Sequence, residues 1–600
     1  HWPRELCAPL TTRVRAEPQP AGGGSGTGLH DVELVWEVAL RDDPLTAAER
    51  AELARSRRPL VQLRGAWVLA GARLRRRAGR RSAGRLGAVA ALGAALSGRA
   101  EVGGEDRRVV VTGRLEDLRR RLAEPPTPAE PPPGLAATLR DYQRRGLRWL
   151  ARTTELGLGC CLADDMGLGK TVTLVALHLH RATGPTLVVC PASLLGNWER
   201  EIRRFAPGEP VRRYHGPGRT LDGVAGGLVL TTYATMRLDA PVLAAHRWDL
   251  VVADEAQHVK NIRSGTARAL RTIPSAARVA LTGTPVENRL DELHAILDWA
   301  VPGLLGSAAV FRRRWAGPIE DDGDRDTAER FAALVRPFLL RRRKTDPGIA
   351  PELPAKTETE HPVGLTREQA GLYEAAVAEA MPRIAGASGL ARRGAVMALL
   401  TALKQICNHP AQYTGEPRPR LAGRSGKLEL LDELLDTVLA ERGAVLVFTQ
   451  YVAMARLLER HLAERGIGAQ LLHGGTAVAE REVMVERFQR GDVPVFLLSL
   501  RAAGTGLNLT RADHVVHYDR WWNPAVEDQA TDRAHRIGQT RPVQVHRIVA
   551  EGTVEDRIAA LLDRKRDLAG AVLDSPAGPA DLAELSDDEL RALVALQEGP

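Results

Sequence analysis

Cysteine and long apolar runs are both scarce in this chain of 600 residues. Its five cysteines are Cys7, Cys160, Cys161, Cys190 and Cys407, and no two of them have the Cys-x-x-Cys spacing. This pattern excludes a zinc knuckle and a disulfide framework, and it indicates a reducing compartment.

Membrane spans and signal peptides are also missing from the sequence. The apolar run from Leu86 to Leu96 is rich in Ala and Gly and too short to cross a bilayer. The first residues, His1-Trp2-Pro3-Arg4, lack the pattern of a signal peptide. We therefore expect a cytoplasmic protein without membrane association. The chain also begins without Met, which is expected of a processed or partial product.

Positive charge, in contrast, is in excess. The net charge is +9 and the pI is about 9.6, and most of the basic residues are arginine. Arginine is well suited to phosphate contacts. The excess fits a nucleic-acid-binding protein, but it also fits a general enrichment in Arg and Ala, so it does not decide between them. The length suggests about four domain-sized units.

A glycine loop lies between an apolar strand, Leu158 to Ala163, and an apolar helical stretch, Val172 to Leu179. Backbone N–H groups of such a loop, together with the positive end of the helix, favour bound phosphate. Lys170 is expected to reach the β- and γ-phosphates, and the Thr171 hydroxyl to bind Mg²⁺. One departure from the usual pattern is Asp164, which stands at the position of the first glycine. The expected nucleotide-binding residues of the loop are Asp165, Met166, Gly167, Leu168, Gly169, Lys170 and Thr171.

A second motif has two carboxylates directly after a buried-strand pattern, Trp248 to Ala253. Carboxylates at the carboxyl end of a parallel strand face the ligand crevice of an α/β sheet. Asp254 is expected to hold Mg²⁺ through its water shell, and Glu255 to orient and deprotonate the attacking water. The alternative is a solvated acidic turn. A glycine-lysine-threonine loop in the same chain favours the ATPase interpretation.

Further motifs follow in a fixed order along the chain: Leu139–Gln143, Val189–Leu195, Thr231–Tyr233, Asp254–Gln257, Leu281–Pro285, Val447–Tyr451, Leu472–Gly474, Ser499–Leu509 and Asp528–Gln539. With this series the chain resembles the Swi2/Snf2 family of superfamily 2 DNA-dependent ATPases, from about Leu139 to Leu568. Asp at position 164 looks usual in that family. Three more segments look like landmarks of the family, Pro337–Arg342, Ile406–Pro410 and Asp519–Pro524. Pro59–Val68 resembles a module fused to bacterial Swi2/Snf2 proteins.

The resemblance implies an α/β fold. It consists of two RecA-like parallel-sheet lobes with inserted helical protrusions and an N-terminal α+β accessory module. The expected domains are an N-terminal module at 1–123, a proline-rich linker at 124–134, lobe 1 at 135–289, helical protrusions with the interlobe linker at 290–430, lobe 2 at 431–570 and a C-terminal tail helix at 571–600. The strands expected in the lobes are Leu158–Ala163, Thr186–Cys190, Leu228–Thr231, Leu250–Ala253, Val279–Leu281, Val445–Phe448, Gln470–Leu472, Val495–Leu498, Val515–Tyr518 and Val543–Arg547.

The resemblance also implies an ATP site shared by the two lobes. Gln143 would read the adenine edge, and Arg533 and Arg536 would reach the γ-phosphate from lobe 2. Their i, i+3 spacing places them on one face of a helix, with Gln529 one turn earlier. The alternative for the two arginines is a surface salt-bridge network. The expected catalytic residues are Lys170, Asp254, Glu255, Arg533, Arg536 and Gln529.

Double-stranded DNA would lie across both lobes and be held by its phosphates without base readout. The candidate contacts are Pro191, Ser193, Thr231, Thr232, Ser499, Gly504, Thr505 and Asn508. Trp521 and Trp522 could stack on a base or pack inside the protein. The basic stretch Arg73–Arg81 could contact DNA or form a solvated helix face.

The leading prediction is an ATP-driven, Mg²⁺-dependent translocase on double-stranded DNA that remodels or displaces bound proteins, such as RNA polymerase, without unwinding. We expect it to be a monomer that associates with the bacterial nucleoid. One alternative is a related motor that acts on transcription complexes or RNA. The other is a non-catalytic nucleic-acid-binding scaffold.

Overall fold

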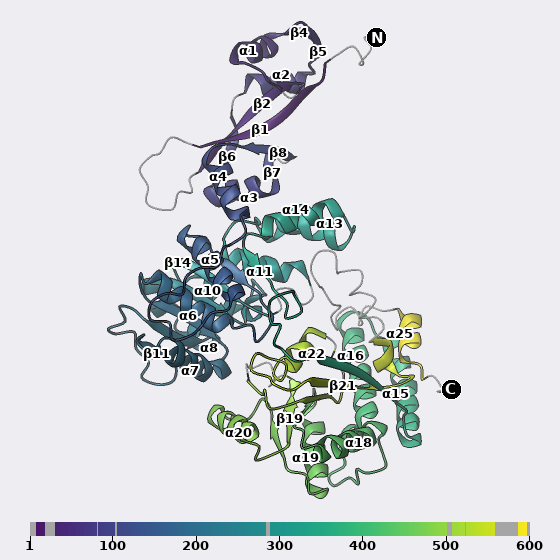
Figure 1. The fold of residues 1–600 in the computed structure, drawn as a ribbon. Coiled ribbons are helices and arrows are strands. Elements are labelled where there is room, and N and C mark those ends of the chain that lie inside the picture. Colours follow the sequence, from purple (N-terminus) through teal and green to yellow (C-terminus); the bar gives the residue numbers. More distant parts are fainter. Residues whose placement is uncertain are drawn as a thin grey trace.

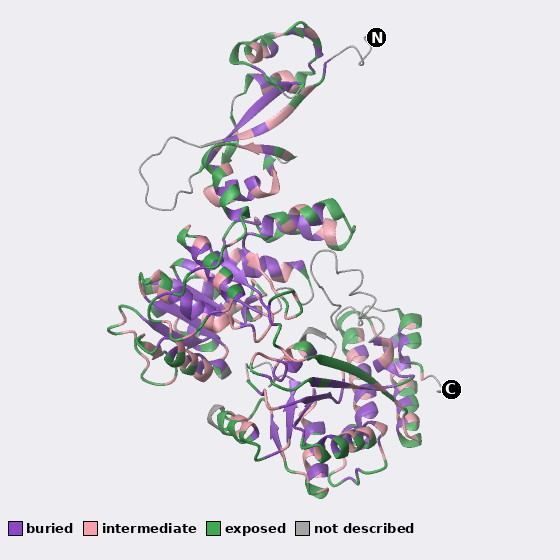
Figure 2. Cartoon of the chain, viewed as in Figure 1, coloured by how far each residue is buried: buried purple, intermediate pink, exposed green. Residues whose placement is uncertain are grey.

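Three sheets form the framework of the chain, and Figure 1 shows them stacked from the N-terminal module through lobe 1 to lobe 2. The structure is a computed structural model that describes residues 8–18, 31–41, 43–80, 82–102, 105–283, 289–500, 507–521, 524–558 and 586–596. None of the helices in these ranges combines the length and the apolar character needed to cross a membrane. In both lobes the central strands are buried, while the outer sides of the helices are exposed (Figure 2).

The N-terminal module is built around a six-stranded mixed sheet with the order β3-β2-β1-β8-β7, in which β6 also pairs with β2. Its strands are β1 (Leu10–Pro18), β2 (Val32–Leu40), β3 (Asp43–Pro44), β6 (Ser82–Leu86), β7 (Arg99–Val102) and β8 (Glu105–Val111), and a separate hairpin has β4 (Leu60–Leu63) and β5 (Ala66–Leu69). Its helices are α1 (Ala47–Arg55), α2 (Ala72–Gly79), α3 (Ala88–Ser97) and α4 (Arg114–Ala123). The module therefore has the expected α+β architecture.

Lobe 1 has a seven-stranded parallel sheet with the order β11-β12-β10-β13-β14-β9-β15. The strands are β9 (Cys160–Leu162), β10 (Thr186–Cys190), β11 (Val211–Arg213), β12 (Leu228–Thr232), β13 (Trp248–Asp254), β14 (Ser275–Leu281) and β15 (Leu339–Leu340). The helices are α5 (Asp141–Glu155), α6 (Lys170–Arg181), α7 (Leu195–Phe205), α8 (Tyr233–Leu238), α9 (Ala240–Ala245), α10 (Gly265–Arg271) and α11 (Leu290–Ala300), with short 3-10 turns at Ala192–Leu194 and Ala256–Val259. Apolar short strands alternate with helices, which is the pattern that produces a parallel sheet covered on both faces.

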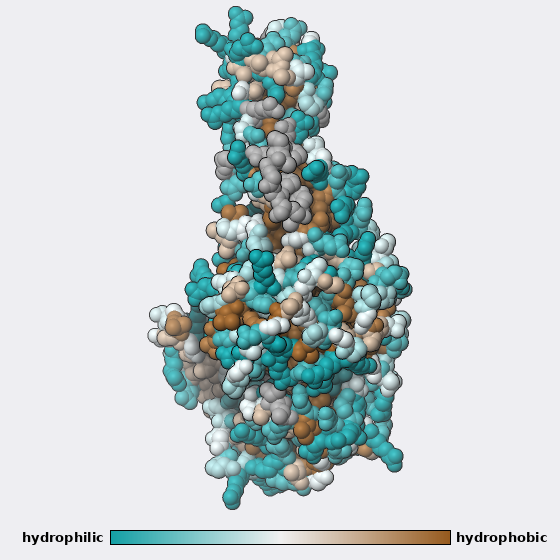
Figure 3. Space-filling view, turned by 90° about the vertical axis from the view of Figure 1, so that its left-hand side faces the viewer, coloured by the Kyte–Doolittle hydropathy of each residue, from teal (hydrophilic) through white to brown (hydrophobic). Residues whose placement is uncertain are grey.

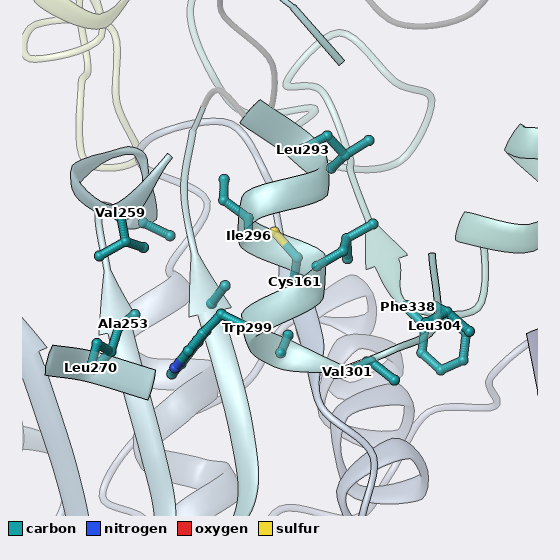
Figure 4. Packing of buried hydrophobic residues seen from close by; sticks show 14 of the residues in the cluster. Cys161, Ala253, Val259, Leu270, Leu293, Ile296, Trp299, Val301, Leu304 and Phe338 are labelled. Atoms are coloured by element: carbon teal, nitrogen blue, oxygen red, sulfur yellow. The ribbon is translucent and has the colours of Figure 1, made fainter. Parts of the chain in front are cut away.

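Apolar packing holds α11 against one face of this sheet. Ile296 and Trp299 of α11 lie over Cys161 of β9 and Ala253 of β13, and Phe338 closes the cluster next to β15 (Figure 4). The opposite face has its own buried cluster beneath α5, α6 and α7.

The stretch 290–430, expected to be mostly helical, also contains two strands. It has helices α11, α12 (Ala308–Phe311), α13 (Gly317–Glu320), α14 (Arg325–Val335), α15 (Arg367–Ala385), α16 (Gly389–Asn408), α17 (Pro410–Thr414) and α18 (Gly426–Ala440), and a π-helical turn at Arg312–Ala316. Between them, β15 completes the edge of the lobe 1 sheet and β16 (Lys356–Val363) forms the edge of the lobe 2 sheet. The two strands escape notice in the sequence because β15 has two residues and β16 is largely polar and exposed.

Lobe 2 has a six-stranded parallel sheet with the order β16-β21-β20-β17-β19-β18. Its other strands are β17 (Val445–Thr449), β18 (Ala469–Leu472), β19 (Val495–Ser499), β20 (His514–His517) and β21 (Val543–Ala550), and its helices include α19 (Val452–Glu464), α20 (Val478–Arg490) and α22 (Pro524–Thr531). A C-terminal helix, α25 (Asp587–Val594), begins with the capping box of Ser586 and Glu589 and packs in one apolar cluster with α15 and α16.

The N-terminal module attaches to lobe 1 through one of its ends. Leu92 of α3 and Leu118 of α4 belong to the same buried cluster as Leu304 of lobe 1. At the edge of this apolar contact, Arg313 forms an ion pair with Glu101 of the N-terminal module at 3.0 Å. The opposite end of the module, with α1, α2, β4 and β5, lies far from this contact (Figure 1).

Candidate active site between the lobes

One cavity of about 490 Å³ receives side chains from both lobes. Lobe 1 contributes Gln143, Gly169, Lys170, Thr171, Asp254 and Glu255, among others, and lobe 2 contributes Asn508, Arg533, Arg536 and Ile537. The structure thus brings the glycine loop, the paired carboxylates and the two arginines to one place. Gln529, expected beside them, lies on α22 and is not among the residues that line this cavity.

The glycine loop connects β9 to α6, as the sequence predicts. Gly167 (φ +87°) and Gly169 (φ +80°) have left-handed backbones that favour glycine. A Cβ on Gly169 would lie 2.4 Å from Nε2 of Gln143, and one on Gly167 would lie 2.6 Å from Cγ of Arg536. Both glycines therefore allow close approach of side chains, and in the case of Gly167 the approaching side chain comes from lobe 2.

Lys170 folds back over the loop. Its Nζ donates to the carbonyl oxygen of Asp164 at 2.5 Å and to that of Asp165 at 3.3 Å. Met166 and Thr171 also line the cavity, whereas Asp165 and Leu168 are not among its lining residues. The loop thus holds an ammonium group at the opening of α6, where an anion would replace the carbonyl contacts.

Asp164, the residue in place of the usual first glycine, has a structural partner. Its buried carboxylate forms an ion pair with Arg342, whose Nε lies 2.9 Å from Oδ1. The same guanidinium donates to the carbonyl oxygen of Tyr142 and lies over the Tyr142 ring at 5.0 Å. The departure from the glycine pattern therefore ties the loop to the segment that leaves lobe 1 after β15.

Gln143 is buried and already engaged with the loop. Its Nε2 donates to the carbonyl oxygen of Leu168 at 3.0 Å, and its Oε1 accepts from the backbone N of Arg140 at 2.9 Å. Tyr142 donates to the same Leu168 oxygen at 2.9 Å. Gln143 also lines the cavity. Both atoms of its amide group already have hydrogen-bond partners in the protein, so a bound adenine would have to share or replace these partners.

The paired carboxylates stand at the end of β13. Asp254 Oδ2 accepts from Nε1 of Trp198 at 2.8 Å, and Oδ1 accepts from the backbone N of Glu255 at 2.9 Å. Burial, followed by the negative charge of Glu255, raises the pKa of Asp254 well above its usual range. A cation bound between Asp254 and Thr171 would favour the ionised carboxylate.

Glu255 has a strained backbone and a fixed side chain. Its φ is +51°, a left-handed conformation that is unfavourable for a residue with a Cβ. Gln257 Nε2 donates to Glu255 Oε2 at 2.9 Å, and Thr282 Oγ1 donates to Gln257 Oε1 at 3.0 Å. This chain of hydrogen bonds orients the Glu255 carboxylate from the end of the neighbouring strand, β14.

Arg533 and Arg536 do reach the cavity, but the prediction that a helix carries them is wrong. Helix α22 ends at Thr531, and the next residues form turns in which Arg536 N donates to the carbonyl oxygen of Ala534. The carbonyl oxygen of Arg533, which a continuing helix would use internally, accepts instead from the backbone N of Leu509 at 3.0 Å. Beyond the end of the helix, the turn is therefore bonded to Leu509 of lobe 2.

Arg533 is deeply buried, with 1% of its surface exposed. Burial lowers the pKa of its guanidinium to about 10, against the opposing attraction of Glu255. Its Nη2 lies 3.6 Å from Sδ of Met166, and its Nε has no hydrogen-bond partner among the described residues. A buried cation with an unsatisfied donor beside Glu255 fits an anionic ligand such as a terminal phosphate.

Several candidate DNA contacts are less accessible than expected. The side chains of Thr231, Thr232 and Ser499 are buried, and the Thr232 hydroxyl caps α8 by accepting from Thr235 N at 3.1 Å. Asn508 lines the cavity between the lobes. Gly504, Thr505 and Trp522 lie outside the described residues, as does the side chain of Ser193; Pro191 is half-buried. Trp521 packs partly against an apolar cluster of lobe 2.

Other residues at the site were not singled out from the sequence. They are Trp198 and Gln257, which hold the carboxylates, and Arg342, which holds Asp164. Gln257 and Arg342 lie in segments that the sequence marks, Asp254–Gln257 and Pro337–Arg342, but neither was given a role. The sequence gives no sign of the role of Trp198, because a tryptophan in an amphipathic helix is predicted to be an ordinary core residue.

Comparisons with known proteins agree with this geometry. Residues 142–412 match the SNF2-related domain, residues 426–538 match the helicase conserved C-terminal domain, and residues 1–96 match a family described as SNF2 Helicase protein. YwqA of Bacillus subtilis (strain 168), provisionally named an ATP-dependent helicase/translocase, is 40% identical over 98% of this chain and 66% of its own length. The ISWI chromatin-remodeling complex ATPase CHR17 of Arabidopsis thaliana is 35% identical over 77% of this chain and 45% of its own length.

A solved structure, the Sulfolobus solfataricus SWI2/SNF2 ATPase core in complex with dsDNA, is 39% identical over 78% of this chain and 99% of that chain, with a TM-score of 0.39. The chain spans about two thirds of the first curated relative and less than half of the second. From the domain matches and the identity to these relatives, the chain belongs to the SNF2 family of helicase-like ATPases.

Proposed function

We propose that this chain is an ATP-hydrolysing motor that moves along double-stranded DNA and displaces proteins bound to it, without separating the strands. The observation that carries the proposal is the shared cavity, in which Arg533 and Arg536 of lobe 2 face the glycine loop and Glu255 of lobe 1. Burial of the Arg533 charge beside that loop costs free energy, and a scaffold that binds no phosphate there would gain nothing to offset it.

In this proposal lobe 1 binds the nucleotide. Lys170 exchanges its contacts to loop carbonyl oxygens for the phosphates of ATP, and Thr171 and Asp254 supply oxygen ligands for Mg²⁺. Bound Mg²⁺ would neutralise charge that develops on the phosphates. Gln143 contributes to the adenine side of the cavity through its position on α5.

Glu255 would orient the attacking water and accept its proton. Its fixed position supports this role, because Gln257 holds one carboxylate oxygen and leaves the other available. Arg533 and Arg536 would stabilise the charge of the transition state, as arginine fingers do in other nucleotide hydrolases. Because they come from lobe 2, hydrolysis would require the closed arrangement of the lobes and would couple chemistry to movement.

The proposed track is duplex DNA, held by its phosphates without base readout. Membership of the SNF2 family and the positive net charge support a nucleic-acid track. Displaced proteins would include RNA polymerase or other DNA-bound proteins, and the motor would work as a monomer on the bacterial nucleoid.

Comparison of polynucleotides would test the proposal. The purified chain should hydrolyse ATP faster with duplex DNA than with single-stranded DNA or RNA, and a Glu255→Gln variant should not. The same preparation should displace a triplex-forming strand and fail to unwind a blunt duplex. Strong unwinding would make the chain a true helicase. Stimulation by RNA alone would favour the RNA-directed motor, and no hydrolysis under any condition would favour the scaffold.

A further inference from the structure

A short segment between the lobes, 340–344, runs beside the glycine loop. Ala163 N donates to the carbonyl oxygen of Leu340 at 2.7 Å, and Asp165 N donates to that of Arg342 at 3.0 Å. Lys344 N in turn donates to Oδ2 of Asp165 at 2.9 Å. Three successive contacts therefore fix the backbone of this segment to the loop of lobe 1.

The side chain of Lys344 crosses from this segment to lobe 2. Its Nζ lies 2.6 Å from Oδ1 of Asp532 and also donates to the carbonyl oxygen of His535. Only 7% of the Lys344 side chain is exposed. Asp532 precedes Arg533 and His535 precedes Arg536, so one ammonium group binds both ends of the turn that carries the two arginines.

We propose that Lys344 is the residue that positions this arginine turn against the glycine loop when the lobes are closed. After α22 has ended, backbone hydrogen bonds of mixed spacing close this turn within lobe 2, whereas Lys344 links it to the segment beside the glycine loop. The inference rests on the proposed function, since it assigns Arg533 and Arg536 to hydrolysis.

The choice of lysine fits this geometry. The chain contains seven lysines and 76 arginines. A lysine at this buried bridge is therefore unusual for a chain whose basic residues are mostly arginine. A compact ammonium with three donors can satisfy one carboxylate and one carbonyl oxygen at an angle, whereas a planar guanidinium favours side-by-side acceptors. Lys344→Arg should therefore be a poor substitute.

Lys344→Met tests the proposal because it keeps the length of the side chain and removes the charge. We expect kcat to fall about 10- to 100-fold, since small displacements of catalytic groups have effects of that size. The dissociation constant for ATP should stay within about threefold of wild type, since lobe 1 binds the nucleotide. Lys356→Met is the matched control: Lys356 pairs with Glu358 on β16 and is not among the residues that line the cavity, so its loss should leave kcat unchanged.

A second variant keeps the test informative if Lys344→Met is poorly folded. Asp532→Asn removes the other half of the bridge and should lower kcat in the same way, and the double variant should be no slower than the slower single variant. A kcat within twofold of wild type in folded Lys344→Met, or multiplied losses in the double variant, would overturn the inference. Absence of hydrolysis by the wild-type chain would instead count against the proposed function.

A second inference comes from the distribution of charge. Residues 1–123 contain 23 arginines, no lysine and 14 acidic residues, a net charge of +9. The other 477 residues contain 60 basic and 60 acidic residues. The whole excess of the chain therefore belongs to the N-terminal module. A general bias toward arginine does not explain it, because the rest of the chain is balanced.

Part of this charge gathers at the end of the module farthest from lobe 1. Arg75 Nη1 donates to the carbonyl oxygen of Ser56 at 2.9 Å, which holds α2 beside the end of α1. Around this contact lie five exposed arginines, here called the tip arginines: Arg55, Arg57, Arg58, Arg76 and Arg80. Within the part of the chain that the structure describes, no carboxylate pairs with any of them. Hydrophilic side chains project from this end of the molecule in Figure 3.

Two other arginines of α2 differ because they have a carboxylate partner. Arg73 and Arg77 both pair with Glu105, and Arg77 also lies over the ring of Trp36 at 4.6 Å. The basic stretch of α2 thus has a paired side that supports the module and an unpaired side that faces solvent.

We infer that the tip arginines bind the phosphate backbone of duplex DNA outside the motor cavity. Exposed guanidinium groups without carboxylate partners can neutralise phosphates and release counterions. The apolar contact of α3 and α4 with lobe 1 would keep this second contact at a fixed distance from the motor. The inference relies on the proposed function only for the choice of duplex DNA as the polyanion.

Replacement of all five tip arginines by Gln tests it. Fluorescence anisotropy with a short duplex should show affinity reduced about tenfold or more at low salt, with a shallower dependence of log K on log salt. ATP hydrolysis without DNA should not change. The matched control replaces five exposed arginines outside the module, Arg325, Arg383, Arg418, Arg420 and Arg442, by Gln.

Equal losses in the two sets would mean that only net charge matters, and unchanged binding and salt slope in the tip variant would mean that DNA is not the ligand. Either result would overturn the inference. A loss confined to RNA binding would overturn it as well. Duplex-stimulated hydrolysis by the wild-type chain, measured in parallel, reports on the proposed function separately.

Discussion

Lobe 1 and lobe 2 are both parallel sheets, yet they supply the cavity in different ways. In lobe 1 the glycine loop and the paired carboxylates follow directly from strand ends, after β9 and at the end of β13, and α5 and α7 supply other cavity residues. In lobe 2 they lie on irregular stretches at 508–510 and 533–538. The hydrogen bonds of the sheet fix the position of a strand end. The position of a turn depends instead on the side chains and backbone groups that contact it.

This difference suggests a division of roles. In the proposed motor, lobe 1 alone would hold the nucleotide, whereas the arginine turn is held both within lobe 2, by Leu509, and from outside it, by Lys344. Variants in lobe 1 should therefore abolish binding or chemistry outright. Variants in lobe 2 should act on kcat and leave nucleotide affinity largely intact.

The largest effects are expected in lobe 1. Glu255→Gln should bind ATP but lower kcat by about 10³-fold or more, because the base that activates water is lost. Lys170→Ala should instead weaken binding, because the loop loses its cation. Single-turnover hydrolysis and nucleotide titration separate the two results. Glu433→Gln, at an exposed position of α18, is the control. Turnover near wild type in Glu255→Gln would refute the assignment of the base.

The arginines of lobe 2 come next. Arg536→Ala should reduce kcat by about 10²- to 10³-fold with little change in ATP affinity, since the residue acts on the transition state. Arg533→Ala should behave similarly. Arg541→Ala, a half-exposed residue of the same lobe that pairs with Asp513, should have no effect. A rise in KM without a fall in kcat would make Arg536 a ground-state contact and remove the contrast between the lobes.

A smaller effect is expected where the lobes touch. Gly167→Ala adds a Cβ that would lie 2.6 Å from Cγ of Arg536, on a backbone with φ +87°. We expect kcat to fall about tenfold, because the arginine turn is pushed away from the loop. Gly65→Ala is the control for a left-handed glycine outside the cavity: Gly65 has φ +77° in the turn between β4 and β5 and no atom within 4 Å of an added Cβ. Full activity of Gly167→Ala would show that the lobes do not rely on this contact.

The same contrast explains what the sequence predicts well. Every strand expected in the two lobes is present, because short apolar runs between helices carry a local signal. The site of lobe 1 follows for the same reason. The predicted arginine helix is wrong because an i, i+3 spacing cannot distinguish a helix from successive turns, and Arg533 here bonds to Leu509 instead of within a helix.

Ion pairs between residues far apart in the sequence could not be predicted from the motifs either. Asp164 pairs with Arg342 across 178 positions, and Lys344 pairs with Asp532 across 188. The burial of Thr231 and the capping role of Thr232 depend on the packing of β12 and α8, which no motif reveals. Spacing along the chain locates a group at a strand end, but it does not show whether that group faces solvent.

The effect that is smallest at neutral pH, where it vanishes, is a difference in acid stability between the two lobes. His517 of β20 is fully buried: its Nε2 contacts the hydroxyl of Thr531 at 2.9 Å, while its Nδ1 has no partner among the described residues. In lobe 1 the buried His178 instead faces the carboxylate of Glu209 at 3.2 Å. Burial lowers the pKa of His517 to about 4.

Because that folded pKa lies below the unfolded value of about 6.5, the unfolded chain takes up the proton first as the pH falls. Stability is therefore complete above pH 6.5 and declines toward pH 4, by about 3 kcal/mol for this group. Hydrogen exchange between pH 7.5 and 5 should show lobe 2 opening before lobe 1. His517→Asn cannot take up this proton, so its stability should depend less steeply on pH, by about one proton. An identical slope in the variant and the wild type, or earlier opening of lobe 1, would mean that His517 does not set the acid sensitivity of lobe 2.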